Sequence, residues 1–220
     1  TELRKVSRFL VILDYINPLE FPADILLNAY YGASHIQYPM KGDTQALLGP
    51  SYFLLREEFV AAGARRRVRA CGRNILVTLG GSDASGLAHK TAQALNYLKR
   101  PDLQVIIVVG MDYSTQERQE LQETLTRFPG KASFLGATNR LAELMLWCDV
   151  AVTGGGLTKY ETAVTGTPSL VLCQAEHQVA LMETFAEAGT ALSLGLGTDV
   201  YAQNLAEDLE SLLGDQVSVG

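Results

Sequence analysis

The chain has 220 residues, of which 47% are hydrophobic and 19% are charged, so it is long and apolar enough to bury a core. Its formal net charge of −6 argues against nucleic acid as a partner, because nucleic-acid binding normally needs a basic face. No apolar run approaches the roughly 18 to 20 residues of a membrane span, and Cys71, Cys148 and Cys173 have neither metal-site nor disulfide spacing. A reducing cytoplasm is therefore the expected location.

The first sixty residues contain two strand-like runs, 8–16 and 23–30, which are too few for an independent layered domain. We interpret residues 1–60 as the C-terminal part of an α/β domain whose first half is missing from the given sequence. Residues 61–73, rich in alanine, glycine and arginine, are the expected linker. The arginine run at 65–69 within it is interpreted as solvated, with contact to phosphate or lipid headgroups as the alternative.

From residue 74 onward, short apolar runs alternate with amphipathic segments, which is typical of a parallel sheet with crossover helices. Strands are expected at 74–79, 103–110, 131–136, 149–154, 169–174 and 190–195. Helices are expected to begin near Ser85, Gln116, Asn139, Leu157, Gln178 and Asp199. Residues 74–220 therefore predict a doubly wound, Rossmann-like α/β domain with six parallel strands and helices on both faces, which would bind ligands at the carboxyl ends of its strands.

A glycine-rich turn, Gly80 and Gly81, follows the first of these strands and precedes a helix. Free backbone N–H groups and the helix dipole attract phosphate in such a context. The turn matches neither a Walker A loop nor the G-x-G-x-x-G pattern. A tight turn with Ser82, Asp83 or Ser85 as the helix N-cap therefore explains it equally well.

A second glycine-rich junction, Gly154 to Gly156, ends another strand just before the helix expected from Leu157. Two such junctions on one sheet edge favour a ligand with two phosphates, or with a phosphate and a sugar. Glu161 follows in the same helix. Either compensation of the helix dipole or hydrogen bonds to a ribose diol would explain this carboxylate.

His177 and Gln178 follow the strand at 169–174, so they are expected on the same ligand edge. A histidine there is either structural or a general acid or base, because its charge is adjustable near neutral pH. The sequence shows no defensible catalytic triad, no paired histidine ligands and no acidic metal cluster. No metal and no cofactor is therefore expected.

Three separated segments occur in one order: "LGGSD" at 79–83, the stretch 141–172, and "EHQ" at 176–178. In this order they resemble the C-terminal domain of GT-B type nucleotide-sugar enzymes, which include the N-acetylglucosaminyltransferase that makes lipid II. Segments 23–33 and 47–59 resemble instead the UDP-2,4-diacetamido-2,4,6-trideoxy-β-L-altropyranose hydrolase of pseudaminic acid synthesis, which is grouped with spore-coat polysaccharide proteins. These two segments separate the hydrolase from the transferase.

The resemblance implies a UDP site without a metal. Glu161 would hold the ribose, Gln178 with His177 beside it would lie near the phosphates and the sugar, and residues 134–138 would lie near the uracil through backbone groups. The residues that the resemblance assigns to UDP are Gly80, Gly81, Ser82, Asp83, Phe134, Leu135, Gly155, Gly156, Leu157, Thr158, Glu161, His177 and Gln178.

The activity implied by the resemblance is that of a UDP-sugar hydrolase in bacterial surface-glycan synthesis, which releases UDP and free sugar by water attack. The alternatives are a UDP-sugar-dependent GT-B glycosyltransferase and a non-catalytic nucleotide-sugar-binding module. The family's Gly-x-Gly-His turn, which carries its proposed catalytic base, has no match in the given sequence. No catalytic residue is therefore assigned, Asp14 receives no role, and a missing N-terminal domain of the same parent protein is an expected partner beside UDP or a UDP-sugar.

Overall fold

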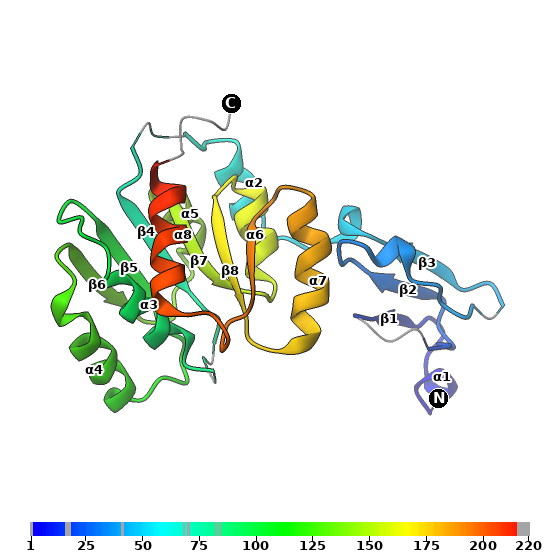
Figure 1. Ribbon diagram of the computed structural model, residues 1–220. Coiled ribbons are helices and arrows are strands. Elements are labelled where there is room, and N and C mark those ends of the chain that lie inside the picture. The colour runs from blue at the N-terminus through cyan, green and yellow to red at the C-terminus, as the bar shows by residue number, and fades with distance from the viewer. Residues whose placement is uncertain are drawn as a thin grey trace. The chain divides into compact units, whose positions relative to one another are not determined.

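The chain folds into two compact units, Thr1–Leu54 and Leu55–Gly220 (Figure 1). The computed structural model describes residues 2–15, 19–40, 42–67, 69, 71–81, 83 and 85–214. The division falls before helix α2 (Glu57–Gly63), whereas the sequence-based expectation had it after residue 60. Phe59 and Ala62 of this helix are buried in a core cluster of the second unit, which explains why the helix belongs there.

The first unit contains a three-stranded parallel sheet in the order β1-β2-β3. Strands β1 (Val11–Leu13) and β2 (Ile25–Asn28) fall within the two expected runs. Strand β3 (Gln45–Leu48) was not expected, because it is only four residues long and its apolar residues do not alternate with polar ones. The unit also holds helix α1 (Glu2–Val6) and the single 3₁₀ turns η1 (Ala33–His35) and η2 (Pro50–Tyr52).

A polar cluster joins the carboxyl ends of β1 and β2. The fully buried Asn28 donates from Nδ2 to the hydroxyl of Tyr38 at 2.8 Å and to the carbonyl of Tyr15 at 3.0 Å. The Tyr38 hydroxyl in turn donates to the Asp14 carboxylate. Burial and this carboxylate raise the pKa of Tyr38 to about 12. Asp14 therefore takes part in holding these two strand ends together.

The second unit contains six parallel strands in the order β6-β5-β4-β7-β8-β9, each within two residues of its expected position. The strands are β4 (Asn74–Thr78), β5 (Gln104–Val108), β6 (Lys131–Leu135), β7 (Val150–Gly154), β8 (Ser169–Cys173) and β9 (Leu192–Leu196). The strand order reverses between β4 and β7, which makes that position the topological switch point where such sheets bind ligands.

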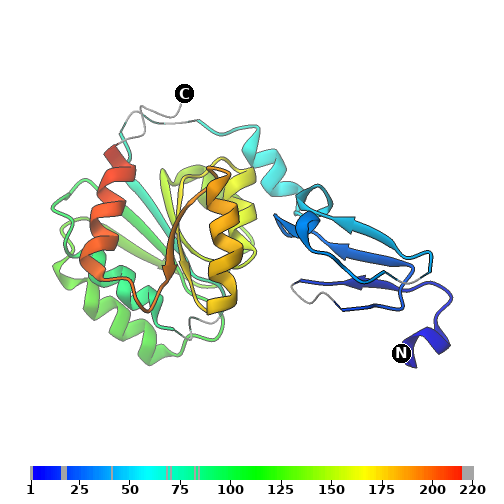
Figure 2. The same ribbon diagram turned by 45° about the vertical axis from the view of Figure 1, so that its right-hand side comes forward.

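Helices cover both faces of this sheet (Figures 1 and 2), and each begins within three residues of its expected start. They are α3 (Leu87–Leu95), α4 (Thr115–Thr124, continued by the 3₁₀ turn η3, Leu125–Arg127), α5 (Leu141–Trp147), α6 (Thr158–Val164), α7 (Glu176–Glu187) and α8 (Ala202–Gly214). The predicted doubly wound α/β architecture is confirmed.

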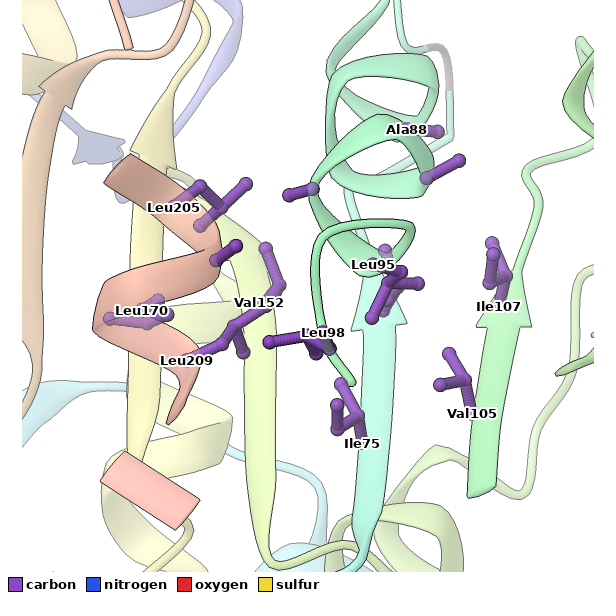
Figure 3. Packing of buried hydrophobic residues seen from close by; sticks show 14 of the residues in the cluster. Ile75, Ala88, Leu95, Leu98, Val105, Ile107, Val152, Leu170, Leu205 and Leu209 are labelled. Atoms are coloured by element: carbon purple, nitrogen blue, oxygen red, sulfur yellow. The ribbon is translucent and has the colours of Figure 1, made fainter. Parts of the chain in front are cut away.

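Alternating residues of the central strand β4 divide the core into two clusters. Ile75 and Val77 pack with residues of α3 and α8 on one face (Figure 3), whereas Leu76 packs with residues of α2 and α5 on the other. Successive side chains of a strand point to opposite faces, so an apolar run without alternation fills both clusters. Strands β7 and β8 are buried along their whole length.

Two arginines of the run at 65–69 contact the end of α5, where Arg66 is partly buried and Arg69 stays exposed. Arg66 donates to the carbonyl oxygens of Met145 at 2.6 Å and Cys148 at 3.0 Å. Arg69 forms an ion pair with the Asp149 carboxylate at 2.5 Å. The interpretation of this run as solvated is wrong for Arg66, because sequence spacing does not reveal that the end of α5 lies beside it.

Replacing Asp149 with alanine is expected to lower the free energy of unfolding by about 3 kcal/mol, because it breaks a buried charge network. The carboxylate is almost fully buried and also accepts the backbone N–H groups of Arg73 at 2.8 Å and Asn74 at 2.9 Å. Urea denaturation measures the loss. Asp102, whose ion pair with Arg100 is solvent-exposed, is the control, and its alanine variant should change stability little. Equal losses in the two variants would contradict this account.

Candidate functional site

A pocket of about 130 Å³ lies where strands β4, β7 and β8 end. Its lining includes five residues that the sequence assigns to the UDP site: Gly80, Gly156, Leu157, Thr158 and Gln178. Leu79, Gly154 and Gln174 complete the lining. Two larger hollows contain no expected site residue: one of about 410 Å³ between α8 and the segment after α3, and one of about 500 Å³ at the amino ends of β8 and β9. The pocket at the switch point is therefore the candidate site, although it is the smaller one.

The first glycine-rich turn is shaped by its own backbone and by the end of β5. Gly80 has φ +95°, in the left-handed region that favours glycine. A Cβ on Gly110 would lie 1.7 Å from the carbonyl oxygen of Gly81, so the two backbones approach too closely for any side chain. Gly110 thus allows the turn to settle against the sheet, whereas Gly81 itself has open space around its Cβ position.

Asp83 caps helix α3. Its carboxylate oxygens accept the backbone N–H groups of Leu87 at 2.8 Å and Ala88 at 2.6 Å, and the hydroxyl of Tyr113 at 2.9 Å. The N-cap position of α3 is Gly86, so the prediction of Asp83 as the N-cap residue is wrong in position, although its carboxylate does accept the first N–H groups of the helix. Its assigned contact with UDP stays a prediction. Ser82 lies outside the described residues.

The glycines of the second junction serve different purposes. A Cβ on Gly155 would lie 3.0 Å from both the sulfur of Cys173 and the Oε1 of Gln178, so this glycine permits tight packing against β8 and α7. Gly156 has nothing within 4 Å of its Cβ position and lines the pocket. Gly155 thus packs against residues next to the pocket, whereas Gly156 is part of the pocket lining.

Glu161 lies one helical turn beyond Leu157, on the same face of α6. Its side chain is only 18% exposed, and its Oε1 lies 3.4 Å from the Nη2 of Arg56. Burial raises the pKa of Glu161, while Arg56 opposes the shift and the nearby Glu58 adds to it. Sequence reasoning missed Arg56, because nothing in the chain from 56 to 161 indicates that the start of α2 meets α6.

Gln174 is a second residue that sequence reasoning missed. Its Nε2 donates to the carbonyl oxygen of Leu79, and its backbone N–H donates to the Oε1 of Gln178 at 2.9 Å. The side chain thus ties the end of β8 to the end of β4. Its position as the last residue of an expected strand was the one available signal, because that places it at the carboxyl edge of the sheet.

Several assigned residues that the structure describes do not line this pocket, namely Gly81, Asp83, Phe134, Leu135, Gly155, Glu161 and His177. His177 is exposed in the first turn of α7. Phe134 is partly buried and packs against the core. Leu135 lines a separate hollow of about 290 Å³ with residues 136–138 beyond β6. Their contacts with UDP stay predictions, and the hollow beyond β6 lies on the same carboxyl edge as the pocket.

A buried cation lies between α6 and α7. Lys159 is fully buried, with its Nζ 5.6 Å from the ring centre of Tyr160 and 5.4 Å from that of Phe185. Burial lowers the pKa of Lys159 to about 8. Burial also raises the pKa of the Cys173 thiol, with the lysine opposing that shift. The interior next to the pocket therefore contains a lysine, Lys159, whose charged form is destabilised by burial.

Within the described ranges, no group of three or more His, Cys, Asp and Glu side chains could hold a metal ion. The helices of that same part of the chain include none that is long and apolar enough to cross a bilayer.

Solved structures with similar architecture include GT-B glycosyltransferases. MurG of Acinetobacter baumannii matches 97% of this chain and 62% of its own, with a TM-score of 0.66 and 17% identity. HepE of Anabaena, solved in complex with UDP and glucose, matches 89% of this chain and 55% of its own, with a TM-score of 0.52 and 19% identity. At these identities the likeness concerns the fold alone, and the predicted GT-B type Rossmann-like domain is confirmed.

Two curated relatives agree with the resemblance drawn from the sequence. The chain is 34% identical over 194 residues to the spore coat polysaccharide biosynthesis protein SpsG of Bacillus subtilis, covering 87% of this chain and 56% of SpsG. It is 25% identical over 189 residues to the pseudaminic acid cytidylyltransferase and UDP-2,4-diacetamido-2,4,6-trideoxy-β-L-altropyranose hydrolase of Helicobacter pylori. The match covers 85% of this chain and 32% of that protein. The chain thus spans 56% or less of each relative. No protein-family model matches it.

Replacing Gly110 with alanine is expected to cost about 1 to 3 kcal/mol of stability and to displace the Gly80–Gly81 turn, because a Cβ there would overlap the backbone of that turn. Thermal unfolding measures the cost. Gly81→Ala is the matched control and should be far milder, since its Cβ position is open. A Gly110→Ala variant as stable as Gly81→Ala would show that the turn is not held against β5.

Proposed function

We propose that the pocket at the switch point binds UDP, and that the protein is the nucleotide-sugar-binding part of a cytoplasmic UDP-sugar hydrolase in bacterial polysaccharide synthesis. The observation that carries the proposal is the pocket itself. Residues from two separate glycine-rich junctions and from the start of α7 meet there, in the arrangement expected for a nucleoside diphosphate. The names of the two curated relatives support the pathway.

The chemistry of the lining suits a diphosphate. Gly156 has nothing within 4 Å of its Cβ position, and Gly80 has only the Gln174 Nε2 at 4.0 Å, so ligand oxygens could approach their backbone closely. Glu161, when ionised, could accept hydrogen bonds from both ribose hydroxyls. The hollow beyond β6 would then receive the uracil against residues 135–138. Under this proposal the site needs no metal, because backbone and amide donors bind the phosphates.

The proposed reaction is attack of water on the sugar C1, with cleavage of the C1–O bond and departure of UDP. The role of this chain is to bind UDP and to stabilise the charge that develops on it as it leaves. The printed name of the Helicobacter pylori relative supports hydrolysis. The fold of MurG favours a glycosyltransferase as the second candidate, in which an acceptor hydroxyl replaces water.

Thermal unfolding with UDP tests the ligand. UDP should raise the melting temperature of the protein by an amount that grows with its concentration relative to the dissociation constant. ATP and NAD at the same concentration should have little effect. No stabilisation by UDP would remove the main support for the proposed function.

Replacing Glu161 with alanine should weaken UDP binding about tenfold to a hundredfold, because two hydrogen bonds to an ionised carboxylate are lost. Isothermal calorimetry measures the affinity, and circular dichroism checks that the fold persists. Glu143→Ala removes an equally sized but exposed carboxylate and should leave the affinity unchanged. Unchanged UDP affinity in Glu161→Ala would remove this residue from the site.

Hydrolysis in ¹⁸O-labelled water by the full-length protein tests the bond that breaks. Attack at C1 places the label on the free sugar, and mass spectrometry should find none on UDP. Label on UDP would instead indicate attack at phosphorus. Release of UDP that requires an added acceptor would favour the glycosyltransferase.

A further inference from the structure

The side-chain amide of Gln174 lies between the two glycine-rich junctions. Its Nε2 donates to the carbonyl oxygen of Leu79. The same nitrogen lies 4.0 Å from the Cβ position of Gly80 and 3.3 Å from that of Gly154. The amide therefore forms part of the pocket surface where the ends of β4 and β7 meet.

The hydrogen bonds of Gln174 fix how both glutamine amides are oriented. A carbonyl oxygen can only accept and an N–H can only donate. The Leu79 carbonyl therefore requires the NH₂ group of Gln174, and the backbone N–H of Gln174 requires the Oε1 of Gln178. The backbone carbonyl of Gln174 accepts a third bond, from the hydroxyl of Ser85 at 3.3 Å. Gln174 is thus held from three sides.

This arrangement leaves amide hydrogens for a ligand. The Nε2 of Gln174 has a second hydrogen, and the Nε2 of Gln178 has two, for which no acceptor is found among the residues that the structure describes. Both side chains line the pocket, and no side chain of that lining is charged. The Leu79 carbonyl, which also belongs to the lining, would repel phosphate oxygens if its lone pairs were not engaged.

We propose that Gln174 determines the preference of this pocket for a diphosphate. Its amide engages the Leu79 carbonyl, and its backbone turns the Gln178 amide so that N–H groups face the ligand. Phosphate oxygens would then meet neutral donors in place of a carbonyl lone pair. The inference rests on the proposed function, and it adds that anion selectivity comes from amide orientation and not from a cationic side chain.

The test compares UDP with uridine, which lacks phosphates, by calorimetry on the whole chain. Gln174→Glu keeps the shape of the side chain, removes the donor and adds a negative charge. It should weaken UDP binding by about a hundredfold and uridine binding by less than about threefold. Gln178→Glu keeps the acceptor for the backbone of Gln174 but removes the donors, and should show the same selective loss.

Two further variants keep the result interpretable. Gln174→Met removes the donor without adding charge, should weaken UDP binding about tenfold, and covers the case in which the glutamate variant does not fold. Gln93→Glu places the same new charge on the exposed surface of α3 and should leave both affinities unchanged. Thermal unfolding without ligand reports any structural damage separately.

The outcomes separate the two claims. Wild-type protein that binds neither ligand contradicts the proposed function, and the inference fails with it. Wild-type protein that prefers UDP, with Gln174 variants that keep the same ratio of UDP to uridine affinity, contradicts only the inference. Equal losses for both ligands would show that Gln174 has a merely structural role and would also overturn it.

Discussion

The pairing of β4 with β7 is the constraint on which the rest of the site depends. The two strands are parallel, and their register sets Thr78 beside Thr153. The segments that follow β4 and β7 therefore leave the sheet at the same level. In the turns that follow, Gly80 has a positive φ, and a side chain at Gly155 would crowd Cys173 and Gln178. Gln174 then ties the turn after β4 to the end of β8.

The sequence was sufficient for the architecture of the second unit, because buried parallel strands such as β7 and β8 are short apolar runs. It also placed Gly80, Gly156, Leu157, Thr158 and Gln178 at one edge. It could not identify Arg56, which reaches Glu161 only after α2 packs beside α6. Strand β3 was missed because pairing with β2, and not its own pattern, makes it a strand.

Two polar side chains outside the lining of the pocket hold helix ends of the second unit. Asp83 holds the start of α3, and Arg66 holds the end of α5, each through hydrogen bonds to backbone groups. Glu161 and Lys159 lie on α6 under strong burial, with shifted pKa values. The lining of the pocket contains no charged residue. Such a site depends on the orientation of its donors more than on net charge.

The central claim is that UDP binds at the carboxyl ends of β4 and β7. Amide chemical shifts measured by NMR during a titration with UDP test it most directly. The account predicts that the amides of Gly80, Gly81, Gly156 and Leu157 shift with one common affinity, while those of Gly166 and Gly189, in the hollow at the amino ends of the strands, do not. Shifts confined to that hollow, or none at all, would contradict it.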